Sequence, residues 1–318
     1  MILGTKDNLN VRVPSAIEQV LAPGMELTIF LLGITVVFLL FLLIRWFLEL
    51  YELDDLENKA VFITGCDSGF GKALAIRCAE RGMPVFAGCL FEKSIAEYRV
   101  LSRNYRTPVD AFILDVTSDD SVDNARKYVE SRTQKYGGLH GVVNNAGVLG
   151  HTFFDDFLTV DDYKNVAEVN TWGVIRVTHA MKPLVKKTRG RIVTVTSICS
   201  RLGLMGIGPY TAAKFALTGY CDVIRSELRI FGVSLHVLEP GFFNTTLTSA
   251  ENVEKQLNSL YARCPEEAKN EYGKEFFFES GYIPLSFLPT PVFEFLMRIM
   301  EWMMRIPTPN ALKNKKQF

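Results

Sequence analysis

The sequence predicts an α/β protein built on a doubly wound, parallel β-sheet and preceded by an N-terminal transmembrane helix. Two observations predict this fold. Between residues 59 and 241, short apolar runs of strand type alternate with helical runs, which is the pattern of a parallel sheet with helices on both faces. Residues 27–44 form an uncharged apolar segment, which is typical of a membrane span. The 318 residues suffice for one large domain after this segment.

The apolar segment, LTIFLLGITVVFLLFLLI, has the length of a membrane span. As a helix it would extend about 27 Å at about 1.5 Å per residue, close to the thickness of a bilayer core. Glu26 and Arg45 bracket it, and Trp46 and Tyr51 suit the membrane interface. The rival interpretation, a cleaved signal peptide, requires a shorter apolar part and a small-residue cleavage site, which the sequence does not show. We therefore predict a polar tail over residues 1–25, a retained anchor over 26–45 and an acidic connector over 46–57.

Six strands and five helices follow in alternation. The strands are expected within residues 59–64, 84–89, 109–116, 139–147, 190–197 and 233–241. The helices are expected over residues 69–81, 92–103, 118–136, a long stretch opened by Thr159, and 210–231. Ser118 suits an N-cap, and Thr159 with Asp162 suits a capping box. This order predicts a Rossmann-type domain over residues 58–275, with ligands at the carboxyl ends of the strands.

Composition argues against two functions. The 35 basic and 35 acidic residues balance, so no basic face for nucleic acid is expected. The six cysteines are scattered, without a C-x-x-C pair or the His/Cys spacing of a metal site. We therefore expect free thiols in a reducing compartment and no bound metal.

A glycine-rich turn joins the first strand to the first helix. The stretch TGCDSGFGKA places Gly65, Gly69 and Gly71 there. Without side chains the backbone can turn tightly and approach a pyrophosphate, which the helix N-terminus then binds through its N–H groups and its dipole. The alternative is an ordinary strand-to-helix turn. The position after a strand and before a helix favours the dinucleotide-binding turn.

The spacing of this turn, G-x-x-x-G-x-G, and the motifs that follow it resemble the short-chain dehydrogenase/reductase family. The later motifs are NNAG at 144–147, VN at 169–170, a serine after the fifth strand, Y-x-x-x-K at 210–214 and PG at 240–241. The stretches VFITGCDSGFGKALA, VVNNAGVLG and LEPGFFNT are similar to the membrane-bound retinol dehydrogenase and 17β-hydroxysteroid dehydrogenase branch. The resemblance implies hydride transfer between a nicotinamide dinucleotide and a lipophilic alcohol, ketone or aldehyde, such as a retinoid or hydroxysteroid.

Tyr210 and Lys214 are the centre of the expected reaction site. They are four residues apart on one predicted helix and therefore share a face. A free phenol has a pKa of about 10, and a nearby ammonium should lower that pKa, which would make the tyrosine usable as a general acid or base. The pair alone could equally be structural. The resemblance implies that Lys214 also binds the nicotinamide ribose, that Ser197 hydrogen-bonds the substrate oxygen, and that Asn170 organises a water relay to the lysine.

The choice between NAD and NADP depends on the 2′ oxygen of the adenosine ribose. A 2′-phosphate favours Arg or Lys, whereas a free hydroxyl tolerates an acid. After the second strand the chain has CLF at residues 89–91, and Asp67 and Ser68 precede the second glycine of the turn. Lys93 could reach a phosphate, but Glu92 lies beside it. The sequence therefore predicts NAD, with NADP as the weaker alternative.

Further cofactor contacts are expected from residues at the strand ends. The resemblance implies that Asp115 receives the adenine amino group, with helix capping as its alternative role, and that Thr245 contacts the carboxamide. The full set expected to bind the cofactor is Gly65, Asp67, Ser68, Gly69, Phe70, Gly71, Asp115, Val116, Asn144, Ala146, Gly147, Tyr210, Lys214, Pro240, Gly241 and Thr245.

The C-terminal region departs from the family pattern. After Gly273 the branch continues with a further helix and a seventh strand, whereas this chain runs into YIPLSFLPTP. We therefore expect six strands, with a sheet edge of the kind that proteins usually cover. The rival function is accordingly a catalytically impaired, nucleotide-binding membrane protein that lacks part of its substrate-binding region.

Residues 276–318 are expected to form an apolar and amphipathic tail. Charged residues recur every three to four positions in residues 291–306, which leaves an apolar face to pack on the domain or to lie in the membrane interface. The ending KKQF resembles an endoplasmic-reticulum retrieval signal, which functions on the cytosolic side. We predict a single-pass protein of the endoplasmic-reticulum membrane with a cytosolic catalytic domain in contact with lipid, for which a homodimer remains an open arrangement.

Overall fold

The computed structural model describes residues 16–49, 55–105, 107–241 and 258–272. The chain divides into two compact units, Met1–Asp54 and Asp55–Phe318. All of the predicted site residues belong to the second unit.

The described part of the first unit is a helix, α1 (Ala16–Glu49). Within it, Leu27–Phe47 comprises 21 residues, none of them buried, and contains an 18-residue window with a mean hydropathy of 3.1. It is long and apolar enough to cross a membrane. The helix extends beyond the predicted anchor at both ends, because flanking residues such as Glu18, Gln19 and Leu48 are good helix formers.

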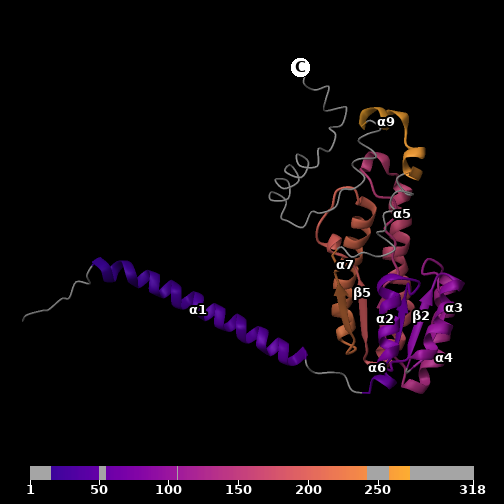
Figure 1. The fold of residues 1–318 in the computed structure, drawn as a ribbon, viewed down its shortest axis with the longest axis horizontal. Coiled ribbons are helices and arrows are strands. Elements are labelled where there is room, and N and C mark those ends of the chain that lie inside the picture. The colour runs from indigo at the N-terminus through magenta and orange to yellow at the C-terminus, as the bar shows by residue number, and fades with distance from the viewer. Residues whose placement is uncertain (1–15, 50–54, 106, 242–257, 273–318) are drawn as a thin grey trace, which may run out of the picture. The chain divides into compact units, whose positions relative to one another are not determined.

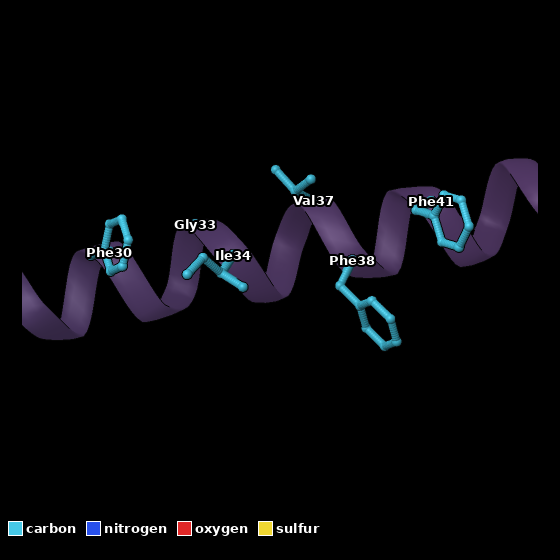
Figure 2. A pocket seen from close by; sticks show the side chains of 6 residues that line it. All are labelled: Phe30, Gly33, Ile34, Val37, Phe38 and Phe41. Atoms are coloured by element: carbon cyan, nitrogen blue, oxygen red, sulfur yellow. The ribbon is translucent and has the colours of Figure 1, made fainter. Parts of the chain in front are cut away.

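A shallow hollow lies on one side of α1 (Figure 2). It is open beside Gly33, where an added Cβ would meet no atom within 4 Å. Its lining carries no polar or titratable side chain, so it offers no reactive group. The lining residues are Phe30, Gly33, Ile34, Val37, Phe38 and Phe41.

Within the described residues, the second unit is built on a six-stranded sheet in which all neighbouring strands are parallel. The strand order is β3-β2-β1-β4-β5-β6. The winding reverses between β1 and β4, which is the point where doubly wound sheets bind ligands at the carboxyl ends of their strands. The predicted fold class is therefore confirmed. The strands are β1 (Ala60–Thr64), β2 (Val85–Cys89), β3 (Val109–Ile113), β4 (Leu139–Asn144), β5 (Arg191–Val195) and β6 (Ser234–Leu238).

Helices cover both faces of this sheet (Figure 1). They are α2 (Gly69–Glu80), α3 (Glu92–Leu101), α4 (Asp119–Thr133), α5 (Val160–Ala167), α6 (Val174–Thr188), α7 (Gly208–Arg229) and α9 (Glu266–Tyr272), with short 3-10 turns at Leu56–Asn58, Ser102–Asn104, Gln134–Tyr136, Asp155–Phe157 and Ile198–Ser200. Alternate residues of a strand face opposite sides. In β1, Phe62 accordingly joins the core beneath α4, α6 and α7, and Ile63 joins the core beneath α2 and α3.

The long helix predicted from Thr159 is interrupted. Its start is as predicted, because Thr159 and Asp162 form a reciprocal capping box. A π-helical turn, η5 (Glu168–Gly173), then separates α5 from α6. A π turn closes on i→i+5 hydrogen bonds and holds one more residue than an α turn, a difference too small for apolar periodicity to reveal. The turn contains Asn170, so the interruption falls at a predicted catalytic residue.

Strand β6 is the last of the sheet among the residues that the structure describes. Alternate residues along it, Ser234, His236 and Leu238, are exposed. The predicted loss of a seventh strand concerns residues after Gly273, and these lie outside the described residues, as does the predicted tail over 276–318. All six cysteines are free thiols in the structure.

Candidate active site

The turn between β1 and α2 holds glycines where a side chain would clash. Gly65 and Gly69 have φ angles of 69° and 56°, in the left-handed region that glycine occupies without strain. A Cβ on Gly65 would lie 2.7 Å from the Cα of Ala146, and a Cβ on Gly71 would collide with the carbonyl oxygen of Gly65. The turn is therefore a tight backbone cradle at the N-terminus of α2, suited to a pyrophosphate. The other predicted residues of this turn are Ser68, the N-cap of α2, and Phe70, which is exposed.

Two residues that sequence reasoning did not single out fix this cradle. Asn145 donates from Nδ2 to the carbonyl oxygens of Thr64 at 2.9 Å and Gly65 at 3.1 Å. In return, Thr64 Oγ1 accepts from the backbone N–H groups of Asn145 and Ala146, both at 3.0 Å. A signal was present, because Asn145 is the second asparagine of NNAG and Thr64 directly precedes the first glycine. The four bonds join the loops after β1 and β4, where the sheet reverses its winding.

The Asp67 carboxylate closes the other side of the glycine turn. It accepts from the N–H groups of Leu90 at 2.8 Å and Phe91 at 3.1 Å, and from Ser94 Oγ at 2.7 Å. These donors stand between β2 and the first turn of α3, where the helix dipole favours a negative charge. A carboxylate therefore lies at the carboxyl end of β2, although β2 itself ends in Cys89.

Asp115 shapes the end of β3. Its Oδ1 accepts from the Thr117 N–H at 2.9 Å and from Thr117 Oγ1 at 2.7 Å. The chain thereby turns toward α4, whose N-cap is Ser118 as predicted. Val116 is 8% exposed, and a Cβ on Gly173 would lie 2.8 Å from its Cγ2. The observed role of Asp115 is thus a local turn, and its contact with adenine stays a prediction.

Two predicted cofactor residues, Asn144 at the end of β4 and Gly147 in the loop after it, lie in different surroundings. Asn144 is 1% exposed and donates to Thr178 Oγ1 at 3.0 Å, so its side chain faces the interior and its cofactor contact stays a prediction. Gly147 lies instead beside two predicted catalytic residues. A Cβ on Gly147 would be 3.2 Å from Asn170 Oδ1 and 3.8 Å from Lys214 Nζ.

Asn170 is fully buried and braces this loop. Its Oδ1 accepts from the Val148 N–H at 2.8 Å, and its Nδ2 donates to the Val148 carbonyl oxygen at 2.8 Å. Because the amide uses both of its ends on one residue, it cannot rotate without losing both bonds. The observed role of Asn170 is to fix Gly147 and Val148, and its water relay to the lysine stays a prediction.

Tyr210 and Lys214 lie together near the start of α7. The Lys214 Nζ is 5.4 Å from the centre of the Tyr210 ring and donates to the Val195 carbonyl oxygen at 3.0 Å. Ser197 follows β5, is 7% exposed and accepts from the Cys199 N–H at 3.2 Å. Its hydroxyl also acts on Tyr210, because it lowers the pKa of that phenol. The structure thus brings three of the four predicted catalytic residues into one group at the carboxyl end of β5.

The pKa of Tyr210 shifts in the direction opposite to the prediction. Burial raises it to about 12, the Ser197 hydroxyl acts in the opposite sense, and the Cys199 thiol adds to the rise. The predicted lowering by Lys214 is therefore wrong for this structure. The physical reason is that the phenol loses water on folding, while the ammonium is directed to the Val195 carbonyl. A further positive charge in the site would shift this pKa back down.

Burial also changes Lys214, which is 4% exposed. It lowers the pKa of Lys214 to about 8, against a smaller opposing effect of the Cys199 and Cys221 thiols. Lys214 therefore still carries its proton at neutral pH. An ammonium has three N–H donors, and the Val195 carbonyl takes one of them. Within the described residues, the lysine thus keeps donor capacity for a ligand oxygen.

Pro240 and Gly241 follow β6 and complete the described part of the site. The Pro240 carbonyl oxygen accepts from the Ile198 N–H at 3.0 Å, which fixes this turn beside Ser197. A Cβ on Gly241 would meet no described atom within 4 Å. The predicted contact Thr245 lies outside the described residues.

The helical residues 258–263 are fixed beside the start of α5. Arg263 Nη2 donates to the Asp162 carboxylate at 2.6 Å, and the Asp162 side chain is 3% exposed. Burial raises the pKa of Asp162, but hydrogen bonds from Arg263 and Thr159 outweigh it and hold this pKa well below its usual range. No local signal pointed to the pair, because its partners are 101 positions apart. The apolar cluster beside it consists of Phe153, Phe157, Leu260 and Cys264.

Comparison with known proteins adds independent findings. The short chain dehydrogenase family profile matches residues 59–256, a span that includes every predicted site residue. The chain is 41% identical over 238 residues to 17-beta-hydroxysteroid dehydrogenase type 6 of Mus musculus, covering 75% of this chain and 74% of that protein. It is 41% identical over 234 residues to Retinol dehydrogenase 5 of Homo sapiens, with coverage of 73% and 72%. Among solved structures, the alcohol dehydrogenase of the archaeon Thermococcus sibiricus complexed with 5-hydroxy-NADP matches with a TM-score of 0.53 and 27% identity, covering 57% of this chain and 76% of that one.

Proposed function

The chain belongs to the short-chain dehydrogenase family, and we propose that, within this family of oxidoreductases, it is an NAD-dependent dehydrogenase of lipophilic alcohols held on a membrane by α1. The observation that carries the proposal is the position of Tyr210, whose ring centre lies 5.4 Å from the Lys214 ammonium and whose pKa is lowered by the Ser197 hydroxyl. Retinoids and hydroxysteroids are the proposed substrate classes, because the relatives compared above are a retinol dehydrogenase and a 17-beta-hydroxysteroid dehydrogenase.

In the proposed reaction, Tyr210 exchanges the proton of the substrate oxygen. Alcohol oxidation requires a deprotonated tyrosine that accepts the hydroxyl proton, and carbonyl reduction requires a protonated tyrosine that donates it. Ser197 hydrogen-bonds the same oxygen and stabilises the charge that develops there. With a pKa of about 12, the unliganded site favours the donor form, so the acceptor role needs an added positive charge nearby. When bound, the nicotinamide supplies the hydride acceptor or donor.

The residues that would hold the dinucleotide are those of the cradle. Gly65 and Gly71 allow the chain to turn tightly at the N-terminus of α2, because a Cβ on either would meet backbone atoms, and the N–H groups at this helix end suit a pyrophosphate. Gly147 leaves space beside Lys214, whose remaining N–H donors suit ribose hydroxyls. The donors and the space therefore fit a nicotinamide dinucleotide.

The proposed preference for NAD rests on the charge at the end of β2. Asp67 lies there, held by the N–H groups of Leu90 and Phe91. A 2′-phosphate in this place would be repelled, whereas a 2′-hydroxyl can donate to a carboxylate. Lys72 on α2 is engaged by Glu97 at 2.5 Å and so does not counter that charge. The solved neighbour complexed with 5-hydroxy-NADP indicates that the fold alone does not choose between the two cofactors.

The proposed location is the endoplasmic-reticulum membrane, crossed once, with the catalytic domain in the cytosol. Its support is the 21-residue apolar stretch of α1, which is long enough to cross a membrane. A lipophilic substrate would then reach the enzyme from the bilayer. The proposal includes a homodimer, and it assigns no residue to the dimer interface.

A second candidate is a nucleotide-binding membrane protein without turnover. The observation that favours it is the sheet, which ends at β6 within the described residues. Both candidates predict binding of NAD, and only the first predicts reduction of NAD by an alcohol.

Microsomes that contain the full chain test the proposal. We expect an alcohol-dependent rise in absorbance with NAD and a panel of retinols and hydroxysteroids, weaker activity with NADP, and none in Tyr210→Phe. Binding of NAD without turnover on any lipophilic alcohol would favour the second candidate. Absence of both binding and turnover would contradict both.

A further inference from the structure

Arg176, in the first turn of α6, binds groups from two other parts of the domain. Its Nη1 donates to the Val116 carbonyl oxygen at 2.8 Å, and its Nη2 donates to Glu168 Oε1 at 2.9 Å. Its Nε donates to the Asp119 carboxylate. The side chain is 21% exposed. Three donors of one planar guanidinium are thus directed at three separate acceptors.

These acceptors belong to two segments that approach each other closely. Val116 and Asp119 lie between β3 and the first turn of α4, and Glu168 is the first residue of the π turn. On the same side, Gly173 permits the approach, because a Cβ there would lie 2.8 Å from Val116 Cγ2. Helical side chains lean toward the N-terminus, which is why Arg176 reaches back across the π turn.

The two segments form opposite ends of the proposed cofactor site. One carries Asp115, which is predicted to receive the adenine amino group, and Val116, another predicted cofactor residue. The other carries Asn170, which braces the loop that holds Gly147. We propose that Arg176 is a positioning residue that couples the adenine end of the site to its catalytic end through the π turn. The identity of the ligand in this inference rests on the proposed function. The coupling between the two segments does not depend on it.

Charge alone does not account for this arrangement. Asp119 is 86% exposed and Glu168 is 42% exposed, and exposed ion pairs contribute little to stability. The Val116 carbonyl is different, because a main-chain acceptor fixes the loop itself. Lysine keeps the charge but lacks the planar fork. Arg176→Lys should therefore resemble Arg176→Gln and not the wild type.

Amide hydrogen exchange on the detergent-solubilised full chain tests the coupling without any cofactor. In both Arg176 variants the Thr117 and Val148 amides should exchange faster, on the order of tenfold, because their partners Asp115 and Asn170 lose their support. The matched control is Arg126→Gln, since Arg126 pairs only along α4, with Asp123 and Glu130, among the described residues. Protection equal to that of the control at both amides would overturn the proposal.

Binding and turnover provide the second measurement. Arg176→Gln should weaken NAD binding, titrated calorimetrically without substrate, by about threefold to tenfold, and should also lower kcat at saturating NAD. Asp119→Asn should change mainly NAD binding, because it weakens the contact of Arg176 with the segment after β3. Glu168→Gln should change mainly kcat, because it weakens the contact of Arg176 with the π turn. A purely structural role would lower the melting temperature and leave both constants at the values of Arg126→Gln, which would overturn the proposal. If the wild type neither binds NAD nor turns over, the proposed function fails while the exchange experiment still decides the coupling.

Discussion

The Lys214 ammonium lies 5.4 Å from the centre of the Tyr210 ring and donates to the Val195 carbonyl oxygen at 3.0 Å. Burial moves each group toward its neutral form, with the pKa of Tyr210 raised to about 12 and that of Lys214 lowered to about 8. At neutral pH the pair is therefore a neutral phenol beside an ammonium. In this form the phenol can donate a proton to a substrate oxygen.

Replacing Tyr210 with phenylalanine should remove turnover and leave cofactor binding. The ring keeps its place in α7, while the proton that the substrate oxygen needs is lost. Loss of general acid–base catalysis typically lowers kcat by about 10²–10⁴-fold. NAD-linked absorbance measures turnover, and fluorescence titration measures the Kd for NAD. A kcat near that of the wild type would exclude Tyr210 from the chemistry.

The buried lysine predicts a pH dependence of stability. Its folded pKa of about 8 lies below the unfolded value of 10.5, so the unfolded chain binds more protons between these values. Stability of the wild type should therefore rise with pH from about 8 to about 10.5 through this group. In Lys214→Met this contribution is absent, so the advantage of the variant in melting temperature should be largest below pH 8 and shrink above it.

Lys164→Met is the matched control for that series, because the Lys164 side chain is 72% exposed. Its difference from the wild type should stay flat across the same pH range. A flat difference for Lys214→Met as well would mean that burial does not shift this pKa.

Gly147→Ala should impair catalysis through crowding. The new Cβ would lie 3.2 Å from Asn170 Oδ1, and Asn170 is held by two bonds to Val148 and cannot yield easily. A displacement of the loop by a few tenths of an ångström should lower kcat on the order of tenfold, because reaction geometry is sensitive to small shifts. The control is Gly219→Ala on α7, where a Cβ meets nothing within 4 Å. Equal kcat values in the two variants would contradict the predicted crowding.

Asp67→Asn should weaken discrimination against NADP. The substitution keeps an acceptor oxygen for the donors at the end of β2 and removes the negative charge that repels a 2′-phosphate. The ratio of kcat/KM for NAD to that for NADP should fall by about tenfold, which corresponds to about 1.4 kcal/mol. Asp161→Asn removes a charge that is 80% exposed on α5 and should leave the ratio unchanged. A ratio that does not move in Asp67→Asn would assign the preference elsewhere.

The strands and the glycine turn could be predicted because their signals are local. The apolar run of β1 and the glycines after it lie within twelve residues of each other, and parallel strand order then places the motifs at one edge of the sheet. Asp67 was expected near the ribose from its position in the turn. Its bonds to the backbone after β2 could not be predicted, because they depend on which loops meet in space.

The sign of the Tyr210 pKa shift shows a second limit of sequence reasoning. Spacing correctly placed Lys214 beside Tyr210. The larger effect on the pKa of Tyr210 is desolvation. Desolvation depends on the whole fold around α7 and cannot be inferred from residue spacing. Two further features could not be predicted. The long helix breaks at Asn170 because of a single extra residue, and Arg263 pairs with Asp162 across distant segments of the chain.

The π turn at Glu168–Gly173 makes the number of residues there as important as their identity. An α-helix advances about 100° per residue, whereas the π turn uses one residue more for about the same rotation. Deletion of one residue within the turn would therefore restore a regular helix and keep the residues beyond it in phase, so Met181, which is fully buried, would stay in the core. Asn170 would lose the turn that positions it. Insertion of one residue in α6 before Met181 would instead rotate that side chain by about 100°. Deletion within the turn should therefore preserve the fold and lower activity, and insertion in α6 should lower the melting temperature.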